Sequence, residues 1–91
     1  MEQSVRFDLE FDVIVQFIAK DSPLRALKFF DEVIDKIENI PNNPYAYRKK
    51  ENAIDKNVRE LIYKGYTIPF EIDNKKQKII ILGIFNQNLW E

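Results

Sequence analysis

The chain has 91 residues, of which 45% are hydrophobic and 32% charged, and its formal net charge is −1. This length predicts one domain over residues 1–91, and the composition favours a folded chain over a disordered one. The sequence contains no cysteine and no histidine, which excludes disulfides, thiolate metal sites and histidine-based proton transfer. We therefore expect no metal and no cofactor, and any catalysis would have to rely on Lys, Arg, Tyr, Asp or Glu.

The charge is unevenly distributed along the chain. Residues 1–44 hold five Lys/Arg against nine Asp/Glu, a balance of −4, whereas residues 45–91 hold nine against six, a balance of +3. This asymmetry indicates two faces with different partners, although solvated charge on a small domain gives the same pattern. The first residues, "MEQSVRFDLEF", are charged, and no apolar run approaches the roughly 20 residues of a membrane helix. We expect a soluble, cytoplasmic protein with no membrane partner.

The first predicted helix covers about residues 5–19. Ser4 is a suitable N-cap, because its hydroxyl can accept a hydrogen bond from the first helical turn. Apolar residues then recur every three or four positions, which is the period of a helix with one buried face. These residues are Phe7, Phe11, Ile14 and Ile18, with Val15 and Phe17 widening the stripe.

The second predicted helix covers about residues 23–39. Ser22 is its N-cap and Pro23 occupies the first helical position, where the missing N–H has no cost. Its apolar stripe is Leu27, Phe30, Ile34 and Ile37. Because so few residues separate the two helices, we expect an antiparallel hairpin.

Residues 41–57 show no sustained period. A connection of this length in a small domain is usually functional, mobile or partly helical. It carries two tyrosines and a group of cations, namely Tyr45, Tyr47, Arg48, Lys49, Lys50 and Lys56.

The pattern then changes to the alternation of β-strands. Strands are predicted at 58–64, 66–72 and 78–85, with turns at Gly65 and at "DNKKQ". Pro69 cannot donate a ladder hydrogen bond, so it requires an edge or an irregular pairing. The element order predicts an α+β fold: an N-terminal two-helix antiparallel hairpin packed on a small, three- to four-stranded antiparallel β-sheet.

The order of these segments resembles the RelE/ParE superfamily of type II toxin–antitoxin toxins. The resemblance depends on "FIAKDSPLRALKFFDEVIDKIENIP" in the first half, and on "VRELIYKGYTIPFEID" followed by "IIILGIFNQNLW" in the second. The family usually begins with a strand before the first helix. Here "MEQ" alone precedes Ser4, so that strand is either missing or a stub. A missing strand would leave an edge that invites an antitoxin strand or a second copy of the chain, as in a homodimer.

The resemblance implies a growth inhibitor held inactive by a cognate antitoxin, with roles in plasmid stabilization and stress response. Some members of the superfamily cut mRNA on the ribosome and others poison DNA gyrase. The shared fold does not choose between these targets.

The RNA-cutting branch resembles a site of arginine, lysine and tyrosine, and this chain departs from it. Thr67 follows Tyr66 where an arginine is common, and amides with a tryptophan follow the last strand. Amides cannot exchange protons near neutral pH, and a pI near 5.5 is low for a phosphate-binding protein. The sequence therefore favours a toxin that acts by binding a protein over one that cleaves RNA.

Arg59 and Tyr66 are weak candidates for catalytic residues. Arg59 matches the arginine of the family's "R-E-L" strand, but a structural pairing with Glu32 or Asp35 explains it equally well. Tyr66 shares a predicted face with apolar residues, which favours a role in the core.

Several residues are candidates for contacts with a target or an antitoxin. Lys49, Lys50, Lys56 and Arg59 offer positive charge, and Asn86, Asn88 and Trp90 follow the last strand. The alternatives are a solvated loop for the lysines, a turn or cap for the asparagines, and a tryptophan folded back over the sheet edge. Tyr45 and Tyr47 either stack on a base or anchor their loop.

Three functions remain open at this point. The first is a ParE-like toxin directed at gyrase. The second is a RelE-like, ribosome-dependent mRNA endonuclease, and the third is a degenerate, non-toxic member that only binds antitoxin.

Overall fold

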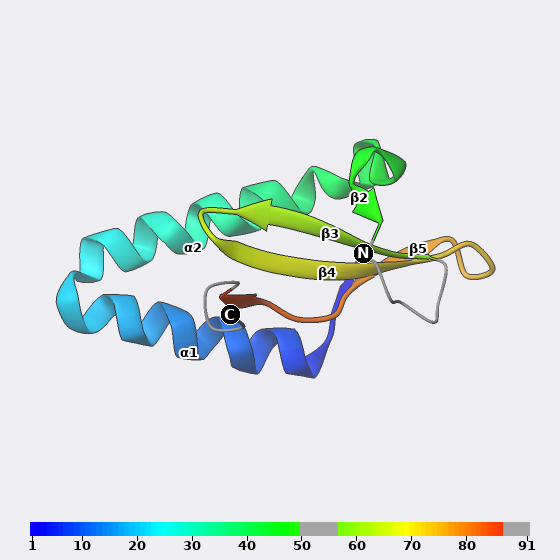
Figure 1. The fold of residues 1–91 in the computed structure, drawn as a ribbon. Helices are drawn as coiled ribbons and strands as arrows, with labels where there is room; N and C mark the ends of the chain where they lie inside the picture. Colours follow the sequence, from blue (N-terminus) through cyan, green and yellow to red (C-terminus); the bar gives the residue numbers. More distant parts are fainter. Residues whose placement is uncertain (50–56, 87–91) are drawn as a thin grey trace.

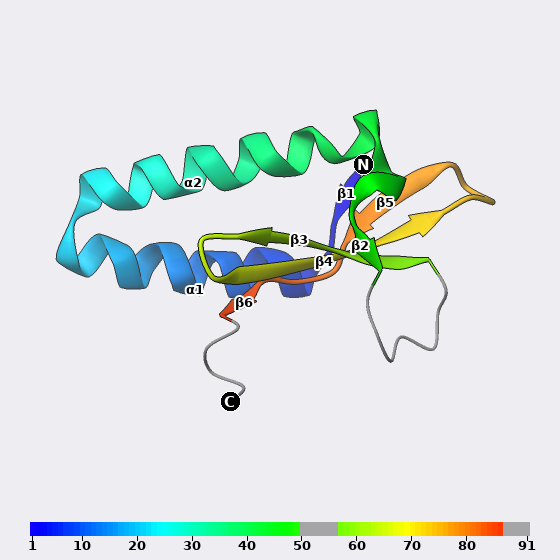
Figure 2. The ribbon, with the colours of Figure 1, turned by 45° about the horizontal axis from the view of Figure 1, so that its top comes forward.

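The structure is a computed structural model that describes residues 1–49 and 57–86. Its elements are β1 (Glu2–Gln3), α1 (Val5–Asp21), α2 (Pro23–Glu38), the 3₁₀ turns η1 (Ile40–Asn42) and η2 (Pro44–Ala46), β2 (Arg48–Lys49), β3 (Val58–Tyr63), β4 (Tyr66–Asp73), β5 (Lys78–Ile81) and β6 (Phe85–Asn86). The two helices run side by side as a hairpin that packs against a twisted sheet (Figure 1, Figure 2). The predicted α+β class is confirmed.

Serine caps explain where both helices begin. Ser4 Oγ accepts a hydrogen bond from Phe7 N at 3.0 Å, and Ser22 Oγ accepts one from Arg25 N at 3.2 Å. Pro23 occupies the first turn of α2, as predicted. Each cap satisfies one of the N–H groups that a helix start leaves unpaired.

The sheet is larger than predicted and is not purely antiparallel. Its order is β1-β5-β4-β3-β2, with β6 also pairing with β4, and β1 runs parallel to β5. The strands β1, β2 and β6 are two residues long, which is too short to produce an alternating pattern in sequence. The N-terminal family strand is therefore present as a stub, with Glu2 opposite Ile80 and Gln3 opposite Ile81.

The single strand predicted over residues 78–85 is interrupted. β5 ends at Ile81 and β6 begins at Phe85. Pro69 faces this interruption, because its carbonyl accepts a hydrogen bond from Leu82 N at 2.9 Å and the N–H of a strand residue lies on the same side as its carbonyl. The irregular pairing expected from Pro69 is thus confirmed.

The predicted turns both form. Lys64 and Gly65 have φ angles of 49° and 82°, which match the two-residue hairpin turn that best fits strand twist. At the other turn, the Asp73 carboxylate accepts hydrogen bonds from the backbone N–H groups of Lys75 and Lys76, both at 3.1 Å.

The core lies between the helical hairpin and the sheet. Its buried members are Phe7, Phe11, Phe29, Val33, Ile37, Ile40, Leu61, Ile68, Phe70, Ile72, Ile79, Ile81 and Ile84. The stripe predicted for α2 is right only in part. Ile37 is buried and Ile34 packs partly buried against the core, but Leu27 is 59% exposed, and the prediction left out the buried Ala26, Phe29 and Val33. Phe30 instead stacks on Phe11 of α1 at 5.2 Å. Because α2 touches both the sheet and α1, its apolar arc is wider than one stripe.

Phe17 also departs from the prediction. It was expected to widen the buried stripe of α1, and it is 73% exposed. The apolar side chains of α1 therefore occupy two faces of the helix, one in the core and one facing outward.

Candidate functional site

An exposed apolar line runs along α1, and we call it the outer stripe. Its members are Val5, Leu9, Val13 and Phe17, spaced four residues apart, and each is between 64% and 76% exposed. Side chains four apart lie above one another on a helix. Contiguous apolar surface of this kind marks an interaction site more often than a free surface.

The outer stripe forms one wall of an apolar groove beside β6. The groove encloses about 650 Å³ and is lined by Leu9, Glu10, Val13, Ile14, Phe17, Tyr66, Ile84, Phe85 and Asn86. Tyr66 belongs to this groove and packs against Phe29 at 5.3 Å. Almost all of the lining is apolar, and Glu10 and Asn86 supply its charged and amide groups.

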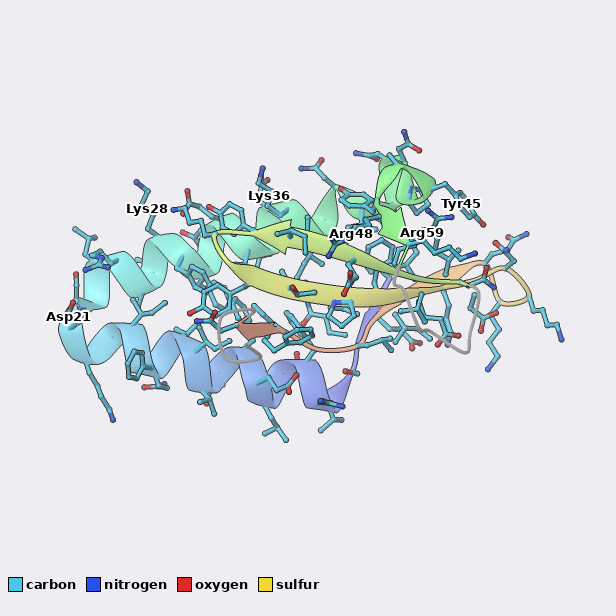
Figure 3. All side chains as sticks on the ribbon, in the orientation of Figure 1. Asp21, Lys28, Lys36, Tyr45, Arg48 and Arg59 are labelled. Carbon is cyan, nitrogen blue, oxygen red and sulfur yellow. The ribbon has the colours of Figure 1, made fainter. Side chains whose placement is uncertain are left out.

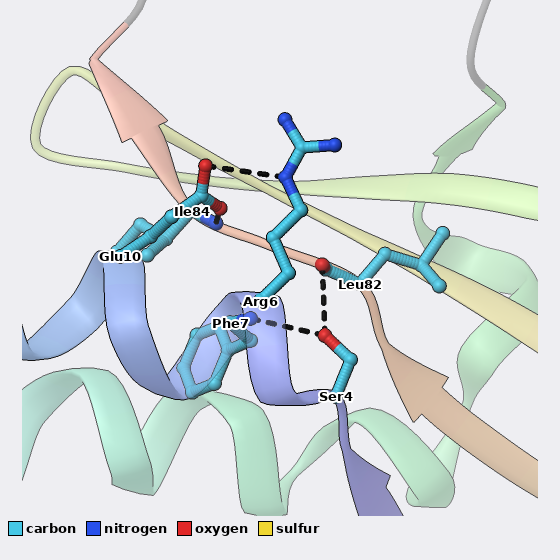
Figure 4. Close-up of polar contacts among 6 residues, drawn as sticks. All are labelled: Ser4, Arg6, Phe7, Glu10, Leu82 and Ile84. Atoms are coloured by element: carbon cyan, nitrogen blue, oxygen red, sulfur yellow. Dashed lines mark hydrogen bonds and ion pairs between the residues drawn. The ribbon is translucent and has the colours of Figure 1, made fainter.

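The segment that contains Ile84, residues 82–84, is bound by side chains from the start of the chain. Glu10 Oε1 accepts a hydrogen bond from Ile84 N at 3.1 Å, and Glu10 Oε2 pairs with Arg6 Nε at 3.3 Å (Figure 4). The Ser4 hydroxyl donates to the Leu82 carbonyl at 2.9 Å. Gly83 lies so close that an added Cβ would be 2.6 Å from Glu10 Oε1. Residues 82–84, of which Ile84 lines the groove, are therefore tied to the start of α1.

Arg59 holds the segment that follows α2. Its guanidinium donates to the Tyr47 carbonyl at 2.9 Å and to the Tyr45 carbonyl at 3.3 Å, and it lies over the Tyr45 ring at 5.1 Å. Tyr47 in turn meets Phe70 edge to face at 5.4 Å. Figure 3 shows Arg59 and Tyr45 together at the end of the molecule opposite Asp21. These contacts make Arg59 a structural clamp for the loop that carries the two tyrosines.

The pairing with Glu32 or Asp35 that the sequence left open as an alternative for Arg59 is wrong. Glu32 accepts a hydrogen bond from Lys64 Nζ at 3.2 Å, in the turn between β3 and β4. This hydrogen bond lowers the pKa of Glu32 and raises the pKa of Lys64. The ion pair joins α2 to the end of the sheet that lies far from Arg59.

The two weak catalytic candidates do not meet. Arg59 stands opposite Phe70 in the β3–β4 ladder, whereas Tyr66 stands opposite Tyr63. Four residues of strand separate Phe70 from Tyr66, a distance of roughly 13 Å at the usual rise per residue. Arg59 and Tyr66 thus belong to different parts of the sheet.

The remaining candidates are dispersed. Lys49 is exposed in the edge strand β2, where its neighbour Arg48 pairs with Glu60 at 3.0 Å. Asn86 lines the apolar groove. Lys50, Lys56, Asn88 and Trp90 lie outside the described residues. Within residues 1–49 and 57–86, no group of three acidic side chains is arranged to hold a metal ion.

Sequence reasoning missed the outer stripe, although its signal was present. The residues Val5, Leu9, Val13 and Phe17 repeat every four positions beside the buried line of Phe7 and Phe11. A helix with two apolar lines has more apolar surface than one core contact can cover. Among the described residues, no helix has the length and apolarity needed to cross a membrane.

Comparison with known proteins places this fold in a family. The sequence model described as "ParE toxin of type II toxin-antitoxin system, parDE" matches residues 2–88. No curated protein matches the chain. A solved structure from P. aeruginosa, titled "Chromosomal ParDE TA system from P. aeruginosa", aligns with a TM-score of 0.74 and 17% identity over 93% of this chain and 91% of that one. The match over residues 2–88 shows that this chain belongs to the ParE toxin family of type II toxin–antitoxin systems.

Proposed function

We propose that this chain inhibits growth by binding a target protein, with DNA gyrase as the target class, and that a cognate antitoxin neutralises it by covering the outer stripe. The observation that carries the proposal is the outer stripe itself. Four apolar side chains in line along α1, each at least 64% exposed, require a partner surface of matching shape.

An amphipathic helix is the form of antitoxin segment that this surface fits best. Such a helix places apolar anchors into a groove at spacings of three, four and seven residues. The apolar groove beside the outer stripe offers a volume of about 650 Å³ for those anchors. Lys49, exposed in the edge strand β2, offers positive charge at a sheet edge, where an acidic stretch of antitoxin would pair favourably.

Protein binding is favoured over RNA cleavage by the arrangement of the candidate residues. Arg59 is engaged by two backbone carbonyls, and Tyr66 lies elsewhere on the sheet against Phe29. Cleavage needs groups that accept and donate protons at one phosphate, held close together. A net charge of −1 adds no general attraction for RNA.

The target class is tested by expressing the chain from an inducible promoter in bacteria. We expect growth arrest with filamentation and DNA-damage signalling, and inhibition of gyrase supercoiling by the purified protein. Early loss of transcripts with intact DNA would instead establish an mRNA endonuclease. Harmless expression would establish a member that only binds antitoxin.

The antitoxin surface is tested with a charge placed in the outer stripe. Val13→Glu should weaken binding to the cognate antitoxin by at least about tenfold, or about 1.4 kcal/mol. Leu27→Glu is the matched control, because Leu27 is an exposed apolar residue of α2 outside the groove. Unchanged affinity in the Val13→Glu variant, measured by calorimetry, would contradict this assignment.

A further inference from the structure

We propose that a second groove, between the two helices, binds a basic amphipathic segment of a partner protein and holds one of its arginine side chains beside Asp8 and Asp12. We call it the interhelical groove, and it encloses about 290 Å³. Its lining comes from β1, α1 and α2 and consists of Gln3, Asp8, Phe11, Asp12, Val15, Phe30 and Ile34. The interhelical groove shares no lining residue with the apolar groove, so this proposal stands independently of the proposed target and antitoxin surface.

The interhelical groove has an apolar floor that is partly open to solvent. Phe30 of α2 stacks on Phe11 of α1, with ring centroids 5.2 Å apart and ring planes 14° apart, and Phe30 is 42% exposed. Val15 and Ile34 line the same groove and are only partly buried. The two helices therefore leave apolar surface between them that a partner side chain can cover with a gain in free energy.

Two carboxylates stand beside this floor, and we call them the acidic pair. Asp8 and Asp12 are one turn apart on α1, so they are neighbours on one face of the helix. Both are exposed, and within residues 1–49 and 57–86 neither takes part in an ion pair. Asp8 favours the start of α1, but Asp12 lies beyond the first turn and gains nothing from the helix dipole. Like charges at this spacing destabilise a helix, and a cation bound beside both removes the repulsion.

Cations of the same helices are engaged elsewhere. Figure 3 shows Lys28 and Lys36 on the side of α2 turned away from α1, and Lys36 Nζ lies over the Tyr63 ring of β3 at 5.6 Å. In the first turn of α1, Arg6 pairs with Glu10, which lines the apolar groove. Positive charge that complements the acidic pair therefore has to come from another molecule.

Arginine matches the interhelical groove in both charge and shape. Its planar guanidinium carries five N–H donors, enough to bind two neighbouring carboxylates. Its aliphatic stem covers apolar surface while the charged end stays at the edge, and its guanidinium is also attracted to the face of an exposed ring such as Phe30. A volume of about 290 Å³ is at the lower end of the range for binding pockets, which suits one long side chain with an adjacent apolar residue. The acidic pair repels phosphate, so the complementary partner is a basic protein segment and not a nucleic acid.

The proposal is tested with a synthetic helical peptide whose only charge is one arginine, with leucines three and four residues away. A twin peptide carries citrulline, the neutral isostere, in place of the arginine. In calorimetry we expect the arginine peptide to bind the native chain at least about tenfold more tightly than its twin, and the Asp8→Asn/Asp12→Asn double variant to bind both peptides alike. Asp35→Asn is the matched control, because Asp35 is an exposed carboxylate of α2 outside the groove lining. That variant should keep the full preference for arginine.

Three outcomes would overturn the proposal. The native chain fails to bind the arginine peptide at millimolar concentration, or it binds both peptides equally. The preference for arginine persists in the double variant, which would place the cation at another site. A native dimer that the double variant abolishes in analytical ultracentrifugation would assign the interhelical groove to a second copy of the chain. Far-UV circular dichroism reports that each variant is folded, and Asp12→Asn alone, a change outside the first turn of α1, repeats the comparison with a smaller expected loss.

Discussion

At the scale of single residues, contacts between distant parts of the sequence determine the local structure. Glu10 binds the backbone of Ile84, and Gly83 provides the space for that carboxylate. The isolated Gly83 is the local sign of an irregularity in this apolar run, but the sequence around it does not reveal the partner that requires it, the carboxylate of Glu10. The same holds for Arg59, whose partners are backbone carbonyls of Tyr45 and Tyr47 that no side-chain pattern reveals.

The Glu10–Gly83 contact makes a prediction about stability. Gly83→Ala would place Cβ 2.6 Å from Glu10 Oε1, which displaces the carboxylate and leaves the buried Ile84 N–H without its acceptor. Hydrogen bonds to charged groups contribute about 1.5–3 kcal/mol, so the free energy of unfolding should fall by about that amount. Glu10→Ala should have a similar effect, and the double variant should lose much less than the sum of the two. Urea denaturation measures the cycle, and strictly additive losses would show that the two residues are not coupled.

At the scale of elements, the sequence predicted what local rules decide. The bounds of both helices were predicted within two residues, because serine caps and Pro23 act within one turn. The buried face of α2 was predicted only in part, because two apolar lines coexist on that helix and tertiary packing selects between them. The two-residue strands were beyond reach, because their pairing depends on partners far away in the chain. At the candidate site, Arg59 and Tyr66 could be named from the sequence, but the distance between them on the sheet could not be predicted.

The corrected face of α2 can be tested by truncating one residue from each line. Phe29 is 7% exposed and contacts both Phe11 and Tyr66, so Phe29→Ala should cost about 3–5 kcal/mol of unfolding free energy. Leu27 is 59% exposed, so Leu27→Ala should cost about 0.5 kcal/mol or less. Chemical denaturation compares the two variants directly. A larger loss for Leu27→Ala would restore the stripe expected from the sequence.

At the scale of the whole molecule, the first and last described segments enclose the site together. β1 pairs with β5, the Ser4 hydroxyl donates to Leu82 and Glu10 accepts from Ile84, so three contacts tie the start of the chain to residues 80–84. The outer stripe and the apolar groove share Leu9, Val13 and Phe17. Any partner that covers these three residues of the outer stripe therefore also covers one wall of the apolar groove.

This shared surface makes a prediction about antitoxin binding, which rests on the proposed function. Phe17 is 73% exposed and belongs to both the outer stripe and the apolar groove, so Phe17→Ala should weaken antitoxin binding by about tenfold, or about 1.4 kcal/mol. Tyr45→Ala, which removes an exposed aromatic near Arg59 at the other end of the molecule, should leave the affinity unchanged. Calorimetry measures both variants. An unchanged affinity in the Phe17→Ala variant would mean that the antitoxin docks without covering this end of the outer stripe.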